Sequence, residues 1–420
     1  MTLPEIPINL FPKAIDLLFI NCHLATMKDG VYNMIKNAAL GVTEDKISWT
    51  GKLSDLPHAT ETLATQVIDC QNQWILPGFV DCHTHLVWAG SRSHEFEMRL
   101  SGASYEEIAG KGGGIRSTVS ATRSATQEEL LAVGSKRMDI FLKQGITCAE
   151  IKSGYGLDLD TELKILSVIN QLNQNCPQHI EPTFLGAHSL PLEYQNRPDD
   201  YVNLVIKEML PKVKDQTIAT AVDVFCEHIA FSRNQTQKIF MAAKDLGLRV
   251  KLHAEQLSDM DGAALAAEFN ALSCDHLEYL SFHGAQQMAK KNVTAVLLPG
   301  AFYYLRQTQK PPVHLFRKFK IPMAVSTDLN PGTSPVHAMT LILNMACLLF
   351  GLTCEEALAG ATLNGARALG LDKRKGSLEV GKDADLVVWD IDTPADLCYL
   401  GGHTPVAMVV ISGKIQYKSV

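Results

Sequence analysis

Several signals are missing from this 420-residue sequence, and each absence argues against a class of protein. The ten cysteines are spread singly between Cys22 and Cys398 without a C-x-x-C pair, so neither a zinc knuckle nor a thioredoxin-like site is indicated. The net charge is −7, whereas nucleic acid and anionic membranes require a basic surface patch. We therefore expect a small molecule as the main partner, with no nucleic acid and no membrane.

Signals for export or membrane insertion are also missing. The first residues, MTLPEIPINLFPKAIDLL, contain no basic segment followed by a long apolar run, and no window is long enough to span a bilayer. Single cysteines fit a reducing compartment in which thiols stay unpaired. These observations predict a cytoplasmic protein.

What is present is the composition of a large folded protein. Apolar residues make up 46% of the chain and charged residues 20%, which is typical of a soluble globular protein. The length exceeds that of a usual single domain, so we expect either one large domain with an appendage or two domains.

Short apolar segments recur from residue 74 onward and are separated mostly by helix-like sequence. Eight segments have the length and composition of strands: 74–83, 146–154, 180–188, 221–228, 249–255, 271–278, 293–300 and 321–330. Strands that alternate with helices form a parallel sheet, and eight such units close naturally into a (β/α)8 barrel. The sequence therefore predicts an α/β protein with a TIM-type barrel over residues 76–378.

The interval 124–145 illustrates the helical pattern. Five of its apolar residues can share one buried stripe of a helix: Leu130, Leu131, Ile140, Phe141 and Leu142. Ser124, followed three residues later by Gln127, has the form of a capping box and predicts that the helix begins there.

Both ends of the chain show a different pattern. Residues 16–27 and 46–51 near the start, and residues 384–391 and 406–418 near the end, are short runs typical of antiparallel strands joined by turns. We expect one small sheet domain built from both ends of the chain, residues 1–75 and 379–420.

Polar residues lie at the ends of the predicted barrel strands, which is where such barrels carry their catalytic groups. The first strand runs into the sequence DCHTH, residues 81–85. Because side chains alternate across a strand, His83 and His85 face the same way and can bind one metal ion. On its own, this H-x-H pair is equally consistent with two hydrogen-bonded polar side chains.

Three later strands end in residues of metal-binding type. His253 ends the fifth strand, His276 the sixth and Asp328 the eighth. Each alone would fit a structural polar residue, but with the H-x-H pair they form a set that suits Zn²⁺ or Fe²⁺. Such an ion lowers the pKa of a bound water to about 7 and polarises a carbonyl. Asp328 could ligate the ion and accept the water's proton, while His276 either hydrogen-bonds the substrate carbonyl or serves as a further nitrogen ligand.

The sequence resembles the amidohydrolase superfamily in LPGFVDCHTH, in the order of His253, His276 and Asp328, and in the tail GSLEVGKDADLVVWD. Within it, HTHLVWAGSR, EIKSGYGLD, FLGAHSLP, LHAEQLSD and STDLNPGTSP resemble the imidazolonepropionase family over nearly the whole chain. The resemblance implies a (β/α)8 barrel with a metal at its mouth, a β-sandwich from both termini and one divalent ion per subunit, Zn²⁺ or Fe²⁺. It implies hydrolysis of the cyclic amide of 4-imidazolone-5-propanoate to N-formimidoyl-L-glutamate in histidine degradation, and it leaves a homodimer open.

The same resemblance implies roles for individual residues. The implied metal ligands are His83, His85, His253 and Asp328, and the implied substrate-binding residues are Arg92, Tyr155, His188, Gln256, Asn330, Gly332 and Thr333. The candidate catalytic residues are Asp328, His276 and Gln256. A guanidinium can hold the substrate carboxylate bidentately, so Arg92 is the expected anchor. Ordinary explanations stay open for these residues: a solvated arginine, a half-buried tyrosine, a core histidine and a simple turn at 330–333.

Other functions stay open on the same scaffold. Related deaminases place a proton-shuttling glutamate three residues after the metal-binding histidine, where this chain has Gln256, and an amide cannot titrate. Glu255 would restore a shuttle only by turning inward. A carboxylated Lys152 bridging two metals is disfavoured because Lys152 falls on the second strand, whereas binuclear members of the superfamily use the fourth. The complete ligand set argues against a catalytically inactive barrel protein.

Two further polar groups are assigned no catalytic role. The segment GKGGG, residues 110–114, lacks the Gly-Lys-Ser/Thr ending of a phosphate-binding loop and is interpreted as a flexible lid. Asp223 and Glu227 share one face of the fourth predicted strand and are expected to support the barrel interior by hydrogen bonding.

Overall fold

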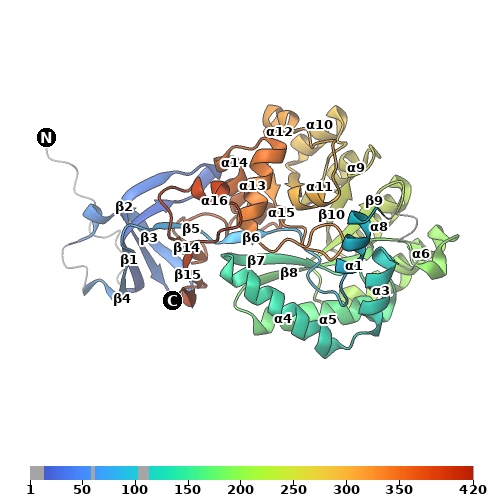
Figure 1. The fold of residues 1–420 in the computed structure, drawn as a ribbon, viewed down its shortest axis with the longest axis horizontal. Helices are drawn as coiled ribbons and strands as arrows, with labels where there is room; N and C mark the ends of the chain where they lie inside the picture. Colours follow the sequence, from blue (N-terminus) through green and yellow to red (C-terminus); the bar gives the residue numbers. More distant parts are fainter. Residues whose placement is uncertain (1–13, 58–61, 103–112, 420) are drawn as a thin grey trace.

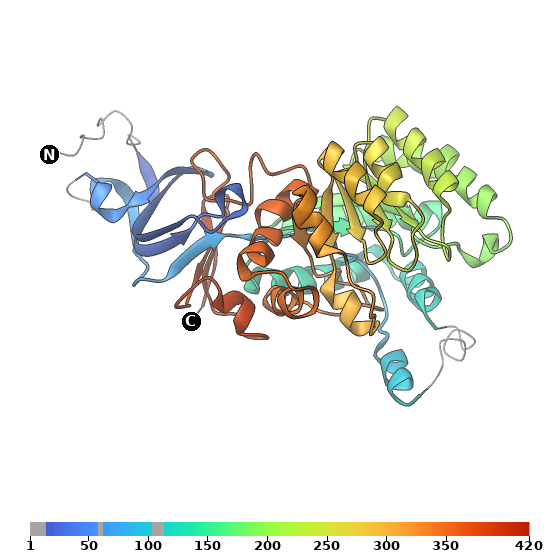
Figure 2. The ribbon, with the colours of Figure 1, turned by 90° about the horizontal axis from the view of Figure 1, so that it is seen from above.

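Two sheets organise the chain, and a computed structural model describes them over residues 14–57, 62–102 and 113–419. One sheet is an eight-stranded parallel barrel, and the other is an eight-stranded sheet made from both ends of the chain. The second sheet lies at one end of the molecule and the barrel at the other (Figures 1 and 2). The fold class expected from the sequence is confirmed.

The barrel strands follow one another in chain order around the sheet. They are β6 (Phe79–Asp81), β7 (Ile146–Lys152), β8 (His179–Ala187), β9 (Ala221–Cys226), β10 (Arg249–Ala254), β11 (Ser273–His276), β12 (Thr294–Leu297) and β13 (Met323–Val325). Each adjacent pair is parallel. A parallel bridge between Thr84 and Leu329 joins the first strand to the last just beyond their ends and closes the barrel.

Helices cover the outside of the barrel (Figure 1). Those that follow the early strands are α1 (Ser93–Leu100), α3 (Ile115–Ser124), α4 (Gln127–Lys143), α5 (Leu159–Asn175), α6 (Pro198–Leu204), α7 (Leu210–Gln216) and α8 (Arg233–Asp245). The later ones are α9 (Gly262–Glu268), α10 (Phe282–Lys291), α11 (Pro299–Tyr304), α12 (Val313–Phe319), α13 (Met339–Phe350), α14 (Cys354–Gly360) and α15 (Leu363–Ala368). In the described part of the chain, none of these helices combines the length and apolar character needed to cross a membrane.

The second sheet has the order β16-β15-β14-β5-β1-β2-β3, with β4 paired to β1. Its strands are β1 (Ile15–Ala25), β2 (Met34–Thr43), β3 (Lys46–Lys52), β4 (Ala64–Asp69), β5 (Trp74–Pro77), β14 (Leu386–Trp389), β15 (Val406–Ile411) and β16 (Lys414–Lys418). Side chains from the N-terminal strands, such as Phe19 and Leu40, share one core with Leu386 and Met408 from the C-terminal strands. The sheet is mixed, because β1 pairs in parallel with β4 and β5, so the expectation of only antiparallel pairing is wrong in part.

The first predicted strand, residues 74–83, is divided between the two sheets. Its first half is β5, which pairs with β1 and β14, and its second half is β6 of the barrel. Gly78 lies between them, and a β-carbon there would come within 2.2 Å of the Thr147 side chain. Only glycine allows the chain to pass so close to β7, and this crossing joins the two parts of the molecule.

The helix expected over the interval 124–145 begins later than predicted. Ser124 ends α3, and the capping box of α4 is formed by Thr126 and Glu129, whose side chains bond each other's backbone N–H groups. Leu130 and Phe141 of the predicted stripe are buried, whereas Ile140 is 40% exposed, because the buried face also uses Gly134 and Met138.

Candidate active site

The site lies where the barrel closes. The carbonyl of His83 accepts a hydrogen bond from the backbone N–H of Asp328 at 3.1 Å, and the N–H of His85 donates to Leu329 at 2.9 Å. Beneath this junction, the Asp81 carboxylate accepts hydrogen bonds from Ser326 and Thr327. The first and last strands are therefore held together at the residues that were predicted to bind metal.

Four imidazoles and one carboxylate converge at this junction, and His83 is shared by two groups of ligand-type residues drawn from these five. One group contains His83, His85 and Asp328, the other His83, His253 and His276, and within each group the ligand atoms lie within 4.8 Å of one another. Oδ1 of Asp328 lies 3.5 Å from Nε2 of His83 and 3.6 Å from Nε2 of His85. The structure thus brings together all five residues singled out at the strand ends.

Two buried aspartates fix the orientation of two of these histidines. Nδ1 of His83 lies 2.6 Å from Asp275, and Nδ1 of His253 lies 2.9 Å from Asp223. With the Asp275 carboxylate as acceptor, the proton of the His83 ring lies on Nδ1, so Nε2 of His83 keeps its lone pair. Nε2 of His83 and Nδ1 of His85 are buried and have no hydrogen-bond partner among the described residues, as expected for nitrogens that bind a ligand from outside the protein.

The environment keeps the imidazoles of His83, His85 and His276 neutral. Burial lowers the pKa of His83, His85 and His276 well below the ordinary value, and neighbouring charges add to this effect. A neutral imidazole is the form that binds a metal. Burial also raises the pKa of the Asp328 carboxyl well above its usual range, so this group gains from a cation placed beside it.

Lys152 lies beneath the site, and its side-chain nitrogen is surrounded by three carboxylates. Its Nζ lies 2.6 Å from Asp223, 2.9 Å from Glu150 and 3.5 Å from Asp275. Burial alone would lower the pKa of Lys152, but these carboxylates raise it above the ordinary value. A lysine held protonated cannot carry a carboxylate on its nitrogen, and Lys152 lies on the second barrel strand, β7. These contacts are compatible with the structural role that the sequence favoured for Lys152.

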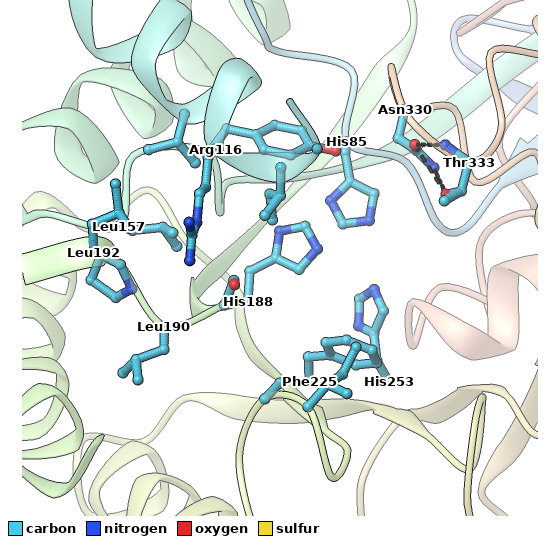
Figure 3. A pocket seen from close by; sticks show the side chains of 18 of the residues that line it. His85, Arg116, Leu157, His188, Leu190, Leu192, Phe225, His253, Asn330 and Thr333 are labelled. Atoms are coloured by element: carbon cyan, nitrogen blue, oxygen red, sulfur yellow. Dashed lines mark hydrogen bonds between the residues drawn. The ribbon is translucent and has the colours of Figure 1, made fainter. Parts of the chain in front are cut away.

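A pocket of about 1170 Å³ opens above the histidines. The predicted residues that line it are His85, Arg92, Tyr155, His188, His253, Gln256, His276, Asp328, Asn330 and Thr333. The rings of His85, His188 and His253 point toward the same hollow (Figure 3). The histidines and Asp328 are buried at its floor, so a ligand held there would be largely removed from water.

Tyr155 is placed by a loop that one buried glutamate holds. Glu162 of α5 accepts hydrogen bonds from the backbone N–H groups of Gly154, Gly156 and Leu157 at 2.8–3.0 Å. The Tyr155 ring is 4% exposed and lies 5.8 Å from the ring of His85, measured between centroids. Glu162 was not identified from the sequence, because a glutamate in the first turn of a helix is ordinary.

His188 stacks on His85, with ring centroids 4.9 Å apart and an interplanar angle of 18°. Its Nδ1 donates a hydrogen bond to the carbonyl of Gly154 at 3.0 Å, so Nε2 is an acceptor. Burial lowers the pKa of His188 to about 4, and the ring is neutral at pH 7. Because Nε2 of the neutral ring can only accept a hydrogen bond, His188 is suited to bind an N–H group of the substrate and not the substrate's carboxylate.

Arg92 and Gly332 are in direct contact at the rim. Nε and Nη2 of Arg92 each lie 2.9 Å from Oε2 of Glu95, and a β-carbon on Gly332 would lie 2.0 Å from Nη1 of Arg92. Arg116 also projects into the pocket (Figure 3) and was not identified from the sequence, because no motif surrounds it.

Asn330 shapes the turn that follows Asp328. Its Oδ1 accepts hydrogen bonds from the backbone N–H groups of Gly332 and Thr333, and its Nδ2 donates to the carbonyl of Asp328 at 2.7 Å. These contacts match an Asx turn, the ordinary explanation left open by the sequence. Asn330 and Thr333 nevertheless line the pocket.

The structure answers which of Glu255 and Gln256 faces the site. Glu255 has a positive φ of 50° and accepts hydrogen bonds from the backbone N–H groups of Gly262 and Ala263, at the start of α9. Gln256 lines the pocket. The carboxylate that could have served as a proton shuttle is therefore engaged elsewhere.

Of the remaining polar residues, Asp223 lies inside the barrel as expected, bound to Lys152 and His253. Glu227 follows β9 and accepts hydrogen bonds from Leu257 and Ser258, so it holds the loop after Gln256. Residues 110–112 of the predicted lid GKGGG lie outside the described residues.

Comparisons with known proteins identify the family of this chain. Residues 74–416 match the amidohydrolase family. An imidazolonepropionase from Colwellia psychrerythraea is 54% identical over 401 residues, which cover 94% of this chain and 96% of that protein. One from Pseudomonas aeruginosa is 53% identical over 389 residues, covering 92% and 96% respectively.

Solved structures with lower identity share the fold. An adenosine deaminase from Xanthomonas campestris with bound zinc has a TM-score of 0.70 at 20% identity and covers 97% of this chain and 94% of its own. A triazine hydrolase variant has a TM-score of 0.72 at 16% identity, covering 96% and 94%. The sequence relatives are far more similar and decide the assignment: this chain belongs to the amidohydrolase family and, within it, to the imidazolonepropionases.

Proposed function

We propose that the protein hydrolyses the cyclic amide of 4-imidazolone-5-propanoate to N-formimidoyl-L-glutamate, a step of histidine degradation. The observation that carries this proposal is the convergence of His83, His85, His253 and Asp328 at the barrel mouth. It is supported by relatives named imidazolonepropionase that are 51–54% identical over more than nine-tenths of the chain.

The donor set fits one divalent ion. His83, His85, His253 and Asp328 would hold it, since their nitrogens and oxygen are buried, close together and partly without partners among the described residues. When bound, Zn²⁺ or Fe²⁺ supplies a positive charge that polarises the amide carbonyl and makes water a nucleophile at neutral pH. Three imidazoles and one carboxylate suit either ion, and metal analysis of the purified protein distinguishes them.

The substrate carboxylate and ring bind to different parts of the pocket. Arg92 holds the propanoate, because its guanidinium is fixed by Glu95 and Gly332 at the rim, and Arg116 adds a second positive charge. Nε2 of His188 accepts a hydrogen bond from a ring N–H. Gln256 offers both a donor and an acceptor to the ring, and Tyr155 covers it. Thr333 and the turn at Asn330 and Gly332 line the remaining wall.

Two residues have catalytic roles: one transfers the proton of the attacking water, and the other stabilises the negative charge of the intermediate. Asp328 accepts a proton from the attacking water and returns it to the ring nitrogen as the carbon–nitrogen bond breaks. His276 stabilises the negative charge that forms on the carbonyl oxygen when water adds to the carbonyl carbon, since its ring lies beside those of His83 and His253. The product gains a carboxylate and leaves through the open rim.

The alternative is a nucleobase-type deaminase. That reaction would release ammonia and has no use for an arginine that binds a carboxylate. It would also lack a proton shuttle here, since Glu255 is bound to the start of α9. A catalytically inactive scaffold would have no reason to keep an oriented set of neutral histidines.

The deciding experiment follows the loss of imidazolone absorbance when purified protein is mixed with 4-imidazolone-5-propanoate. We expect turnover without ammonia release, loss of turnover with a chelator, and recovery on adding back Zn²⁺ or Fe²⁺. Turnover that is unchanged after complete metal removal would refute the metal's role. Ammonia release would favour the deaminase.

Location, assembly and domain division complete the proposal. Ten free cysteines fit a cytoplasmic location, which fractionation would test. A homodimer, and the lack of binding to nucleic acid or membrane, stay predictions that light scattering and binding assays would check. We keep residues 1–75 with 379–420, and 76–378, as the proposed division into two domains.

A further inference from the structure

Three cysteines from three helices meet on the outer face of the barrel. Cys347 lies on α13, Cys354 is the first residue of α14, and Cys398 lies on α16 (Asp396–Tyr399). Their Sγ atoms all lie within 4.8 Å of one another, and none forms a disulfide. The three helices lie beside each other near the small sheet (Figure 1). We call Cys347, Cys354 and Cys398 the thiol cluster.

The spacing of the thiol cluster fits a metal ion. Zinc–sulfur bonds of about 2.3 Å place the sulfurs of a tetrahedral site about 3.8 Å apart. Small side-chain rotations bring three Sγ atoms from within 4.8 Å to this separation. Thiolates select soft ions such as Zn²⁺, Cd²⁺ and Cu⁺ over Mg²⁺ and Ca²⁺.

The thiol cluster is also accessible. Cys398 is buried, whereas Cys347 and Cys354 are half-buried, so an ion can reach the sulfurs from solvent. A hydrogen bond from Cys398 lowers the pKa of Cys347, whereas burial raises the pKa of Cys354. Metal binding displaces the thiol protons in either case.

We propose that Cys347, Cys354 and Cys398 bind one thiophilic metal ion of the zinc class, separate from the site at the barrel mouth. The two sites differ in chemistry, because the thiol cluster offers three sulfur ligands and the site at the barrel mouth offers nitrogen and oxygen ligands. An ion in the thiol cluster also links the two parts of the molecule. Helix α16 connects β14 to β15 of the small sheet, whereas α13 and α14 follow the last barrel strand.

The proposed link lies beside a contact that already joins these parts. Nδ2 of Asn344, on α13, donates a hydrogen bond to the carbonyl of Cys398 at 2.7 Å. An ion bound one turn further along α13 would reinforce this contact. We therefore expect metal binding to the thiol cluster to raise the thermal stability of the holoenzyme without changing its turnover.

The test is a titration of reduced holoenzyme with Cd²⁺, followed by the ultraviolet charge-transfer band of cadmium–thiolate bonds. The proposed ligands at the barrel mouth contain no sulfur, so this band does not report on that site. We expect one equivalent of thiolate-bound Cd²⁺ per chain, and a rise in Tm when Zn²⁺ replaces it. Absence of the band, or a disulfide within the cluster in protein purified without oxidant, would overturn the proposal.

Three variants make the titration specific. Cys354→Ser and Cys347→Ser, on different helices, should each lose the band and the Zn²⁺-dependent rise in Tm while keeping turnover. Cys176→Ser is the matched control, because Cys176 is also half-buried and free but lies outside the cluster. Cys176→Ser should keep both the cadmium–thiolate band and the Zn²⁺-dependent rise in Tm. An equal band in wild type and in either cluster variant would count against the site.

Discussion

The guanidinium of Arg92 lies directly against the α-carbon of Gly332. A β-carbon at position 332 would lie 2.0 Å from Nη1 and 2.9 Å from Cζ of Arg92. The other side of the guanidinium faces Glu95, whose second oxygen binds the backbone N–H of Gly114 and the hydroxyl of Ser117. Arg92 is thus held between Glu95 of α1 and the turn after the last barrel strand.

Gly332→Ala should therefore impair substrate binding without unfolding the protein. The added methyl group meets the end of a flexible side chain, so Arg92 moves away from the rim and the fold is kept. We expect KM to rise about tenfold, the effect of weakening one charge-assisted hydrogen bond, with a smaller change in kcat. Steady-state kinetics would measure this. Gly401→Ala is the control, since a β-carbon there makes only ordinary contacts; a KM that is equal in both variants would contradict the role of Arg92.

Asp275→Asn tests the support of the metal site. Asp275 orients His83 through a 2.6 Å contact with Nδ1, and an amide is a weaker acceptor than a carboxylate. We expect the affinity for the catalytic metal to fall about tenfold or more, measured by competition with a chelator. Circular dichroism would show that the fold persists. Unchanged metal affinity would mean that Asp275 does not support metal binding through His83 and only balances the positive charge of Lys152.

Asp328→Asn tests the proton transfer. Asparagine has nearly the same shape but cannot accept and return a proton, so kcat should fall at least about 100-fold. The metal content should be measured alongside, because Asp328 is also a proposed ligand. Asp139→Asn, on the exposed side of α4, is a control. A near-normal rate in Asp328→Asn would remove this residue from the mechanism.

The positions of the site residues could be predicted from the sequence because strand ends are visible in it. Apolar runs followed by His253, His276 and Asp328 mark where a barrel strand reaches the mouth. Asp275 could not be predicted in the same way. Alternation places it on the opposite face from His276, yet both point inward, because His276 has a φ of 82° and turns its side chain back. Backbone conformations of this kind are set by tertiary contacts and are typical of functional sites.

Two other differences have similar causes. The division of residues 74–83 between two sheets is invisible in the pattern, because both halves are equally apolar and only Gly78 marks the crossing. The roles of Glu162 and Glu227 depend on backbone N–H groups from loops, and no side-chain motif reports where such groups will lie. Cys347 and Cys398 are 51 residues apart, and only the packing of α16 on α13 brings them together.

Asp383 gives a prediction about pH that is independent of the active site. It is bound to Lys46 of β3, to Arg374 at 2.9 Å and to Lys375 at 3.1 Å. Burial would raise the pKa of Asp383, but these cations lower it to about 2 from an ordinary 3.8. The folded state therefore gains stability above the unfolded pKa and loses it as the pH falls toward 2.

Asp383→Asn should lower the free energy of unfolding by about 2 kcal/mol at pH 7, and the difference from wild type should shrink as the pH falls below about 4. Urea unfolding at a series of pH values would measure both effects. Asp390→Asn is the matched control, because Asp390 is exposed at the end of β14 and should change stability little at any pH. A gap between Asp383→Asn and wild type that stays constant from pH 7 to pH 3 would show that the three cations do not stabilise the ionised carboxylate.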